Sequence, residues 1–235
     1  MSIRVTLSAN AGVAIEIGTA RIWVDALHQT SVPGFSTLQD RQVRELWTAD
    51  AFQRPDAMVY THCHPDHYSA ELTEEAHRRW PGARLFLPEE QLPGQELLSG
   101  TAPAAAVGNA ALQFFRLPHE SAVYRHIPHY GLTISCGGDT VLLPGDCAVA
   151  APELLPWVQG RHYRLALLNF PWATLRKGRD FMEQSLSAEH IVLYHLPFAE
   201  DDTEGFRHAA ETAAQQLRGA QIHIMDDFRQ TLLIP

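Results

Sequence analysis

The sequence lacks any apolar run that approaches the roughly 20 residues needed to span a membrane. The first residues also lack the long apolar core of a signal peptide, so we expect a cytoplasmic protein with no membrane partner. Cysteine is scarce. Cys63, Cys136 and Cys147 form neither an even set nor a CxxC pair, so no disulfide scaffold is implied. Glycine-rich phosphate loops of the P-loop or Rossmann type are absent as well.

Basic residues are few for a chain of 235 residues, with 18 Lys and Arg against 27 Asp and Glu and a formal net charge of −9. Because a nucleic-acid interface needs Lys and Arg to neutralise phosphates, no nucleic-acid partner is expected. This balance does not exclude a small anionic substrate. No stretch has the composition of a linker, so residues 1–235 are expected to form one domain.

The most informative stretch follows a short apolar run, residues 58–60, which is typical of a buried strand. Three histidines and one aspartate then fall within six positions: His62, His64, Asp66 and His67. Neutral imidazole nitrogens and carboxylate oxygens suit zinc, iron or manganese. Pro65 turns the chain, and Ser69 can cap a helix over residues 70–80. The predicted order is therefore strand, metal-binding loop, helix.

The spacing His62-x-His64-x-Asp66-His67 resembles the HxHxDH signature of the metallo-β-lactamase superfamily. By position, the resemblance implies that His62 and His64 bind a first metal together with a later histidine. Asp66 and His67 would bind a second metal with a bridging aspartate and a final histidine. The implied fold is α/β (α+β), a four-layer αββα sandwich of two mixed β-sheets with outer helices and with the metals along one edge.

The third ligand of the first metal is expected at the end of a strand. His119 follows the apolar run of residues 112–117 and matches that place in the family pattern. His126 and His129 lie close by in the sequence and stay open as alternatives. We place His129 beside the pocket as a candidate substrate contact and His126 in a loop.

The ligands of the second metal also follow predicted strands. Asp146 comes after the strand over residues 140–143, in a Pro-Gly-Asp motif that resembles the family's bridging aspartate. Gly145 would let the backbone turn tightly there. His195 ends the apolar run that begins at residue 191 and matches the final ligand of the second site. Cys147 and Cys63 are interpreted as small packing residues, as most free cysteines are.

One aspartate is expected beneath the metals. Asp25 ends the third strand of a β-meander over residues 4–24. In the resembling family an aspartate at this place orients a ligand histidine, as carboxylates do at many zinc sites. A plain turn residue is an equal alternative. The polar insertion over residues 26–54 would open near the metals and could help to form the substrate pocket.

The other elements follow from periodicity and turn residues. Helices are predicted over residues 37–47, 89–98, 152–158, 181–186 and 205–217. Strands are predicted over residues 84–87, 132–135, 164–170, 221–225 and 230–234. Residues 100–108, rich in alanine, are predicted to form a loop.

Together these features predict a metal-dependent hydrolase. Two divalent ions about 3.5 to 4 Å apart could hold a hydroxide as the nucleophile, and Asp66 could accept a proton as well as bind metal. The resemblance implies a small-molecule ester, lactone, amide or phosphate ester as the substrate, with ascorbate-6-phosphate lactonase as the most similar branch. Zinc is expected first, with manganese or iron as alternatives, and pairing of exposed sheet edges would allow a homo-oligomer.

Three other functions stay open. A nuclease of the tRNA 3′-processing type carries the same signature, but the acidic balance of this chain argues against it. An iron-dependent redox enzyme is a second alternative, although flavodiiron members replace one ligand histidine by glutamate and His64 is retained here. A metal-stabilised binding module without catalysis is the third, and it would have a closed coordination shell.

Overall fold

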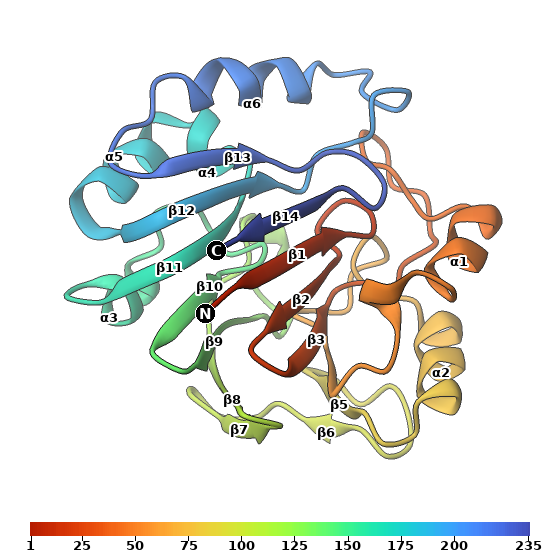
Figure 1. Cartoon of the computed structure of the whole chain (residues 1–235). Coiled ribbons are helices and arrows are strands. Elements are labelled where there is room, and N and C mark those ends of the chain that lie inside the picture. The colour runs from red at the N-terminus through yellow and green to blue at the C-terminus, as the bar shows by residue number, and fades with distance from the viewer.

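The computed structural model describes residues 1–235, with the exception of the side chain of Ala122. Two seven-stranded sheets face each other, with helices on the outside (Figure 1). Sheet 1 has the strand order β14-β1-β2-β3-β4-β5-β6, and sheet 2 has the order β13-β12-β11-β10-β9-β8-β7. Each sheet combines antiparallel and parallel pairs, so the predicted αββα sandwich of two mixed sheets is confirmed.

The strands of sheet 1 are β1 (Ile3–Leu7), β2 (Val13–Ile17), β3 (Ala20–Val24), β4 (Ala57–Val59), β5 (Arg84–Leu87), β6 (Glu96–Leu97) and β14 (Thr231–Ile234). The strands of sheet 2 are β7 (Ala104–Val107), β8 (Ala110–Arg116), β9 (Tyr130–Cys136), β10 (Asp139–Leu143), β11 (His162–Asn169), β12 (Ser187–Tyr194) and β13 (Gln221–Ile224). The α-helices are α1 (Asp40–Leu46), α2 (Ala70–Arg79), α3 (Leu155–Val158), α4 (Pro171–Thr174), α5 (Arg176–Ser185) and α6 (Phe206–Ala214). Short 3₁₀ turns are η1 (Asp50–Phe52), η2 (Ala122–Tyr124) and η3 (Pro152–Leu154).

Apolar side chains from both sheets fill the space between them. Val5 of sheet 1 and Leu132 of sheet 2 are fully buried in one common cluster. Neighbouring residues of a strand point to opposite faces, and accordingly Leu167 belongs to this inner cluster while Leu168 packs with Trp172 of α4 in a second cluster. The second cluster fixes α3 to α5 on the outer face of sheet 2, and α1 and α2 flank sheet 1 (Figure 1).

The strand directions bring several strand ends to one edge of the sandwich. In sheet 1, β3 and β4 are parallel, and in sheet 2 the strands β10, β11 and β12 are parallel. Strand β8 runs in the same direction as β10, because each of them pairs antiparallel with β9. The carboxyl ends of these strands therefore gather at the same edge. The segments that follow them carry the predicted metal ligands.

The predicted helix over residues 89–98 is wrong. Pro93 and Gly94 interrupt this segment, and Gly94 has a φ of +80°, outside the helical region. The side chain of Gln95 accepts hydrogen bonds from the backbone N–H groups of Gln91 and Leu92 at 2.7 and 2.6 Å, and so holds a turn. The chain then adds β6 to the edge of sheet 1. Turn chemistry and sheet pairing outweigh the helical preference of the Glu and Gln residues.

The predicted loop over residues 100–108 is also corrected, because residues 104–107 form strand β7. This strand pairs antiparallel with β8, in register from Ala104 opposite Gln113 to Val107 opposite Ala110. Alanine has a low strand propensity, so the sequence itself gave little sign of a strand. The turn at residues 108–109 and the available edge of β8 supply the pairing.

Helix boundaries differ from the predicted ones by a few residues. Helix α1 begins at Asp40 rather than at residue 37, because Gln39 and Gln42 form a reciprocal capping box. Helix α5 begins at Arg176, five residues before its predicted start at 181. In the part of the chain that the structure describes, no helix has the length and apolar character that crossing a membrane would require.

Candidate metal centre

The loop after β4 turns sharply, so that its polar side chains face one side. The backbone N–H groups of His67 and Tyr68 both donate to the carbonyl oxygen of His64, at 3.0 and 2.9 Å. Ser69 then caps α2, its hydroxyl accepting from the N–H of Leu72 at 3.3 Å. The predicted order of strand, polar loop and capped helix is therefore present.

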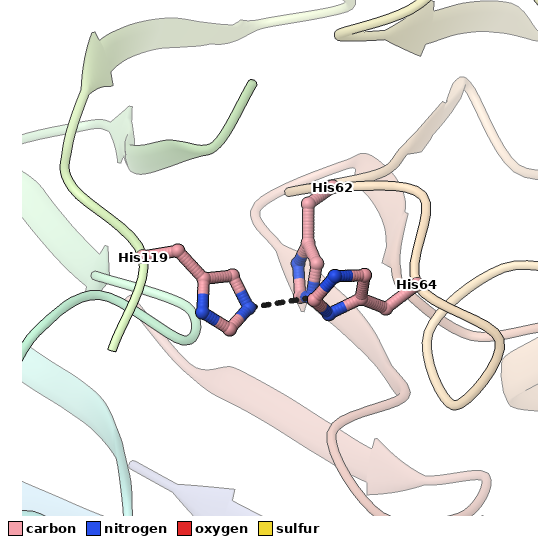
Figure 2. A group of neighbouring side chains, drawn as sticks. All are labelled: His62, His64 and His119. Atoms are coloured by element: carbon pink, nitrogen blue, oxygen red, sulfur yellow. Dashed lines mark hydrogen bonds between the residues drawn. The ribbon is translucent and has the colours of Figure 1, made fainter. Parts of the chain in front are cut away.

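The first group of candidate ligands consists of His62, His64 and His119. One ring nitrogen from each lies within 4.8 Å of the others. Figure 2 shows His119 reaching from the segment after β8 toward the two histidines of the β4 loop, with its Nε2 3.3 Å from Nε2 of His62. Sheet 2 thus supplies one ring and sheet 1 supplies two. The three histidines predicted to bind the first metal therefore lie together in space.

Two further groups continue from the first one. His62 and His67 gather with Asp146, and Asp66 and His67 gather with His195. The Nε2 atom of His67 lies 3.1 Å from Nε2 of His195 and 3.2 Å from Oδ2 of Asp146. Oδ2 of Asp66 is 3.7 Å from Nε2 of His195. All predicted ligands of both metals therefore lie in one continuous cluster.

The spacing of these donor atoms fits divalent metal ions. Donor atoms that bind one zinc ion tetrahedrally at about 2.0–2.1 Å lie about 3.3–3.4 Å from each other. The donor pairs His119–His62 at 3.3 Å and His195–Asp146 at 3.4 Å match that separation. Imidazole and carboxylate groups alone also form the donor set of many zinc, iron and manganese sites. The residues present can hold a metal, and ligation by each of them stays a prediction.

Burial keeps the histidines of the first group neutral. Desolvation by burial lowers the pKa of His119 to about 4. Burial, followed by the charge of His67, lowers the pKa of His62 well below its usual value, and burial also lowers the pKa of His64. A neutral imidazole has a free nitrogen lone pair, which is the form that binds a metal. At neutral pH this group is therefore ready for an ion without prior deprotonation.

The second part of the cluster is held together by the charge of Asp146. Burial acts to raise the pKa of Asp146, but the imidazoles of His195 and His67 outweigh it and hold this pKa well below its usual range. Burial acts to lower the pKa values of His67 and His195, and Asp146 outweighs that effect and raises both. Because a metal binds the deprotonated nitrogen of an imidazole, an ion at this part of the cluster competes with protons for these rings.

Asp25 lies directly beneath the cluster and is 1% exposed. Its Oδ1 accepts from the backbone N–H of Thr61 at 2.7 Å, and its Oδ2 accepts from the Thr61 hydroxyl at 2.6 Å. Oδ2 also lies 3.0 Å from Nδ1 of His67. This contact leaves Nε2 of His67 facing the other candidate ligands. Asp25 is thus placed to orient a histidine, as the family resemblance implied.

Replacing Asp25 with asparagine is expected to weaken metal binding and to destabilise the fold. The backbone N–H of Thr61, its hydroxyl and Nδ1 of His67 all point at the Asp25 carboxylate. In asparagine, an NH₂ group would face one of these three. We expect metal affinity to fall by about 10–100-fold and the free energy of unfolding to fall by about 1–3 kcal/mol. Metal titration and denaturant unfolding measure the two effects. Asp227→Asn, on a side chain that is 65% exposed, is the matched control. An Asp25→Asn variant with the same metal affinity as this control would refute the orienting role.

His129 and His126, the alternatives to His119, lie outside the three groups of candidate ligands found among the described residues. His129 is fully buried, with its ring centre 5.3 Å from that of His62 and 5.7 Å from that of His119. A β-carbon on Gly145 would lie 2.7 Å from Nε2 of His129, so only glycine fits beside this ring. His126 is exposed and contacts the carbonyl of Val123 at 3.1 Å. Substrate contact by His129 stays a prediction.

The cysteines near the site are thiols. Burial raises the pKa of Cys63 to about 12, and burial raises that of Cys147 well above its usual value. Metal binding requires the thiolate. These cysteines are therefore poorly suited as ligands, in line with the packing role inferred from the sequence.

Three residues beside the cluster were missed from the sequence. Nδ2 of Asn169, at the end of β11, donates to Oδ1 of Asp146 at 2.6 Å. The ring centre of Tyr124 lies 4.7 Å from that of His64, and the ring centre of Phe35 lies 4.6 Å from that of His195. Asn169 could have been found by the strand-end rule that located the other site residues. Tyr124 ends the short turn η2 and Phe35 lies in the insertion over residues 26–54, so neither residue follows a strand.

A scan against models of protein families and a search of curated proteins both find no match for the chain. Solved structures do match. A metallo hydrolase from the archaeon Ignicoccus hospitalis, Igni18, is similar with a TM-score of 0.67 and 18% identity over 100% of this chain and 99% of that one. YhfI from Bacillus subtilis, a metallo-β-lactamase fold protein, is similar with a TM-score of 0.63 and 14% identity over 99% of both chains.

CmlA, a diiron β-hydroxylase from Streptomyces venezuelae, is similar with a TM-score of 0.63 and 15% identity. The match covers 99% of this chain and 54% of that chain. At such identities the likeness concerns the arrangement of the backbone and not the chemistry. The two facing mixed sheets of this chain agree with the fold named for the Bacillus subtilis protein. The chain has the metallo-β-lactamase fold.

Proposed function

We propose that the chain is a metal-dependent hydrolase of a small-molecule ester, lactone, amide or phosphate ester, acting in the cytoplasm on a substrate that is not a nucleic acid. The observation that carries the proposal is the continuity of the three ligand groups, which share His62 and His67. Adjacent groups that share members provide places for two neighbouring ions. Zinc is the proposed metal, since imidazole and carboxylate donors at these spacings suit it.

Each residue of the cluster has a proposed role. The first ion would be held by the predicted first site, and the second by Asp66, His67 and His195, with Asp146 between them. When bound, two such ions supply a hydroxide nucleophile at neutral pH and polarise the scissile carbonyl or phosphoryl group. Asp66 keeps 13% of its side chain exposed, so it can also accept a proton from the solvent side.

Aromatic side chains beside the candidate ligands could contact the substrate. The exposed ring of Tyr124 contacts the first group of histidines, 5.2 Å from the ring centre of His119. The half-buried ring of Phe35 contacts His195 at the other end of the cluster. Two aromatic rings thus border the metal positions, and their faces can pack against an apolar part of the substrate. The fold alone does not choose among esters, lactones, amides and phosphate esters.

The test is a hydrolysis assay with zinc-loaded protein. The probes are p-nitrophenyl acetate, γ-butyrolactone, p-nitrophenyl phosphate and bis(p-nitrophenyl) phosphate. We expect turnover of at least one probe that is lost with a chelator and restored by zinc. Turnover of the diester alone would favour a phosphodiesterase of the nuclease type. Two bound ions without turnover of any probe would refute the proposal and favour a binding module.

An iron-dependent redox enzyme is a second candidate, favoured by the similarity to the diiron β-hydroxylase from Streptomyces venezuelae. The donor set of imidazoles and carboxylates suits iron as well as zinc. This candidate predicts that protein purified from cells contains iron and absorbs visible light. Zinc-loaded protein would then be inactive on every hydrolysis probe.

A further inference from the structure

Asn169 occupies a fixed position at the edge of sheet 2 where the candidate ligands gather. It is the last residue of β11 and pairs with Tyr194 of β12, directly before the candidate ligand His195. The next backbone N–H, that of Phe170, donates to the carbonyl of Tyr194 at 3.0 Å. The side chain is 9% exposed. The strand pairing therefore holds the amide group at one place beside Asp146.

The two oxygens of Asp146 have different partners. Oδ1 accepts a hydrogen bond of 2.6 Å from Nδ2 of Asn169. Oδ2 lies 3.2 Å from Nε2 of His67 and 3.4 Å from Nε2 of His195. A hydrogen bond from an amide to a carboxylate is charge-assisted and directional. One oxygen is thus tied to the sheet, and the other faces the positions of the metals.

From this division of the two oxygens, we propose that Asn169 is a positioning residue that makes Asp146 present a single oxygen, Oδ2, to the metal ions. The inference rests on the proposed dinuclear centre. A carboxylate that offers one oxygen to two ions holds them closer together than one that offers both. Asn169 would therefore set the separation of the ions, and with it the affinity for the second ion, without touching either of them.

Among the residues that the structure describes, the oxygen of the Asn169 amide makes no hydrogen bond that would compete with the contact to Asp146. Within the described part of the chain, Oδ1 of Asn169 is buried and has no hydrogen-bond partner. The residue therefore has one polar contact that defines its orientation, and that contact is the one to Asp146. Gly145, with a φ of +62°, lets the backbone turn directly before Asp146. The turn brings the Asp146 carboxylate to the edge of sheet 2, and the Asn169 amide fixes the rotation of that carboxylate.

The experiment is a zinc titration of metal-free protein in competition with a chromophoric chelator, together with the absorption spectrum of the cobalt-substituted form. Asn169→Asp keeps the shape of the side chain but replaces the donor by a negative charge facing Asp146. Asn169→Leu removes the donor without adding charge. In both variants we expect one zinc ion to bind nearly as in the wild type, the second to bind about 10–100-fold more weakly, and the cobalt spectrum to change.

Asn109→Asp is the matched control, because it makes the same change in an exposed turn between β7 and β8. Thermal unfolding of the metal-free variants separates positioning from folding. If both variants bind two zinc ions with affinities within twofold of the wild type, the inference is overturned. It is also overturned if the affinities for both ions fall equally and the melting temperature falls with them. Wild-type protein that binds fewer than two ions would overturn the proposed function itself.

Discussion

Replacing Asp146 with alanine is expected to remove at least one bound ion and to abolish metal-dependent hydrolysis. Its Oδ2 lies within 3.4 Å of both His67 and His195, at the junction of the two proposed metal positions. Its charge is also what raises the pKa values of these two histidines. Loss of a group that only supports a ligand costs about 10–100-fold, so loss of the bridging ligand should exceed ~100-fold in kcat/KM.

Elemental analysis and steady-state kinetics on the best probe measure both effects of Asp146→Ala. Asp180→Ala is the control, because that side chain is 52% exposed on α5 and pairs only with Arg176 of the same helix among the described residues. The control should keep two ions and full activity. An Asp146→Ala protein that retains two ions and activity within tenfold of the wild type would contradict the bridging role.

Replacing His119 with alanine is expected to remove about one ion per chain, whereas His129→Ala and His126→Ala should retain two. Of the three histidines, only His119 belongs to a ligand group, with its Nε2 3.3 Å from Nε2 of His62. His129 is nearby but packs against Gly145. The three variants thus decide between the alternatives that the sequence leaves open.

The measurement for these variants is zinc content after dialysis against metal-free buffer. Removing the buried ring of His129 leaves a cavity, so a lower melting temperature is expected for that variant alongside full metal content. His126→Ala, at an exposed position, serves as the neutral reference. Full occupancy in His119→Ala, with loss in His129→Ala, would transfer the third ligand position to His129.

Much of the candidate site could be predicted because one sequence pattern recurs along the chain. Apolar β-branched or aromatic runs mark buried strands, and a polar residue directly after such a run lies at a strand end. His195 was located in this way, and Asp146 by the Pro-Gly-Asp motif that follows a predicted strand; β10 and β12 run in the same direction and bring the two residues to the same edge. Periodicity alone could not show which strands would be neighbours. The family resemblance supplied that arrangement.

Other features could not be predicted, for different physical reasons. Strand β7 consists largely of alanine, and its pairing with β8 depends on tertiary context rather than on propensity. Asp25 and His195 both adopt φ values in the left-handed region, +50° and +59°, which residues other than glycine rarely occupy. Such backbone strain is stable only where the surroundings enforce it. The contact of Asn169 with Asp146 links two strands and is not visible in either segment alone.

The proposed dinuclear centre is best tested by the metal content of the wild-type protein, determined by elemental analysis after purification without chelator. We expect about two equivalents of divalent metal per chain, with zinc or manganese predominating. Predominant iron would keep the centre and favour the redox candidate. A protein that binds no metal, even after reconstitution with zinc, manganese and iron, would have no dinuclear centre and could not be a metal-dependent hydrolase.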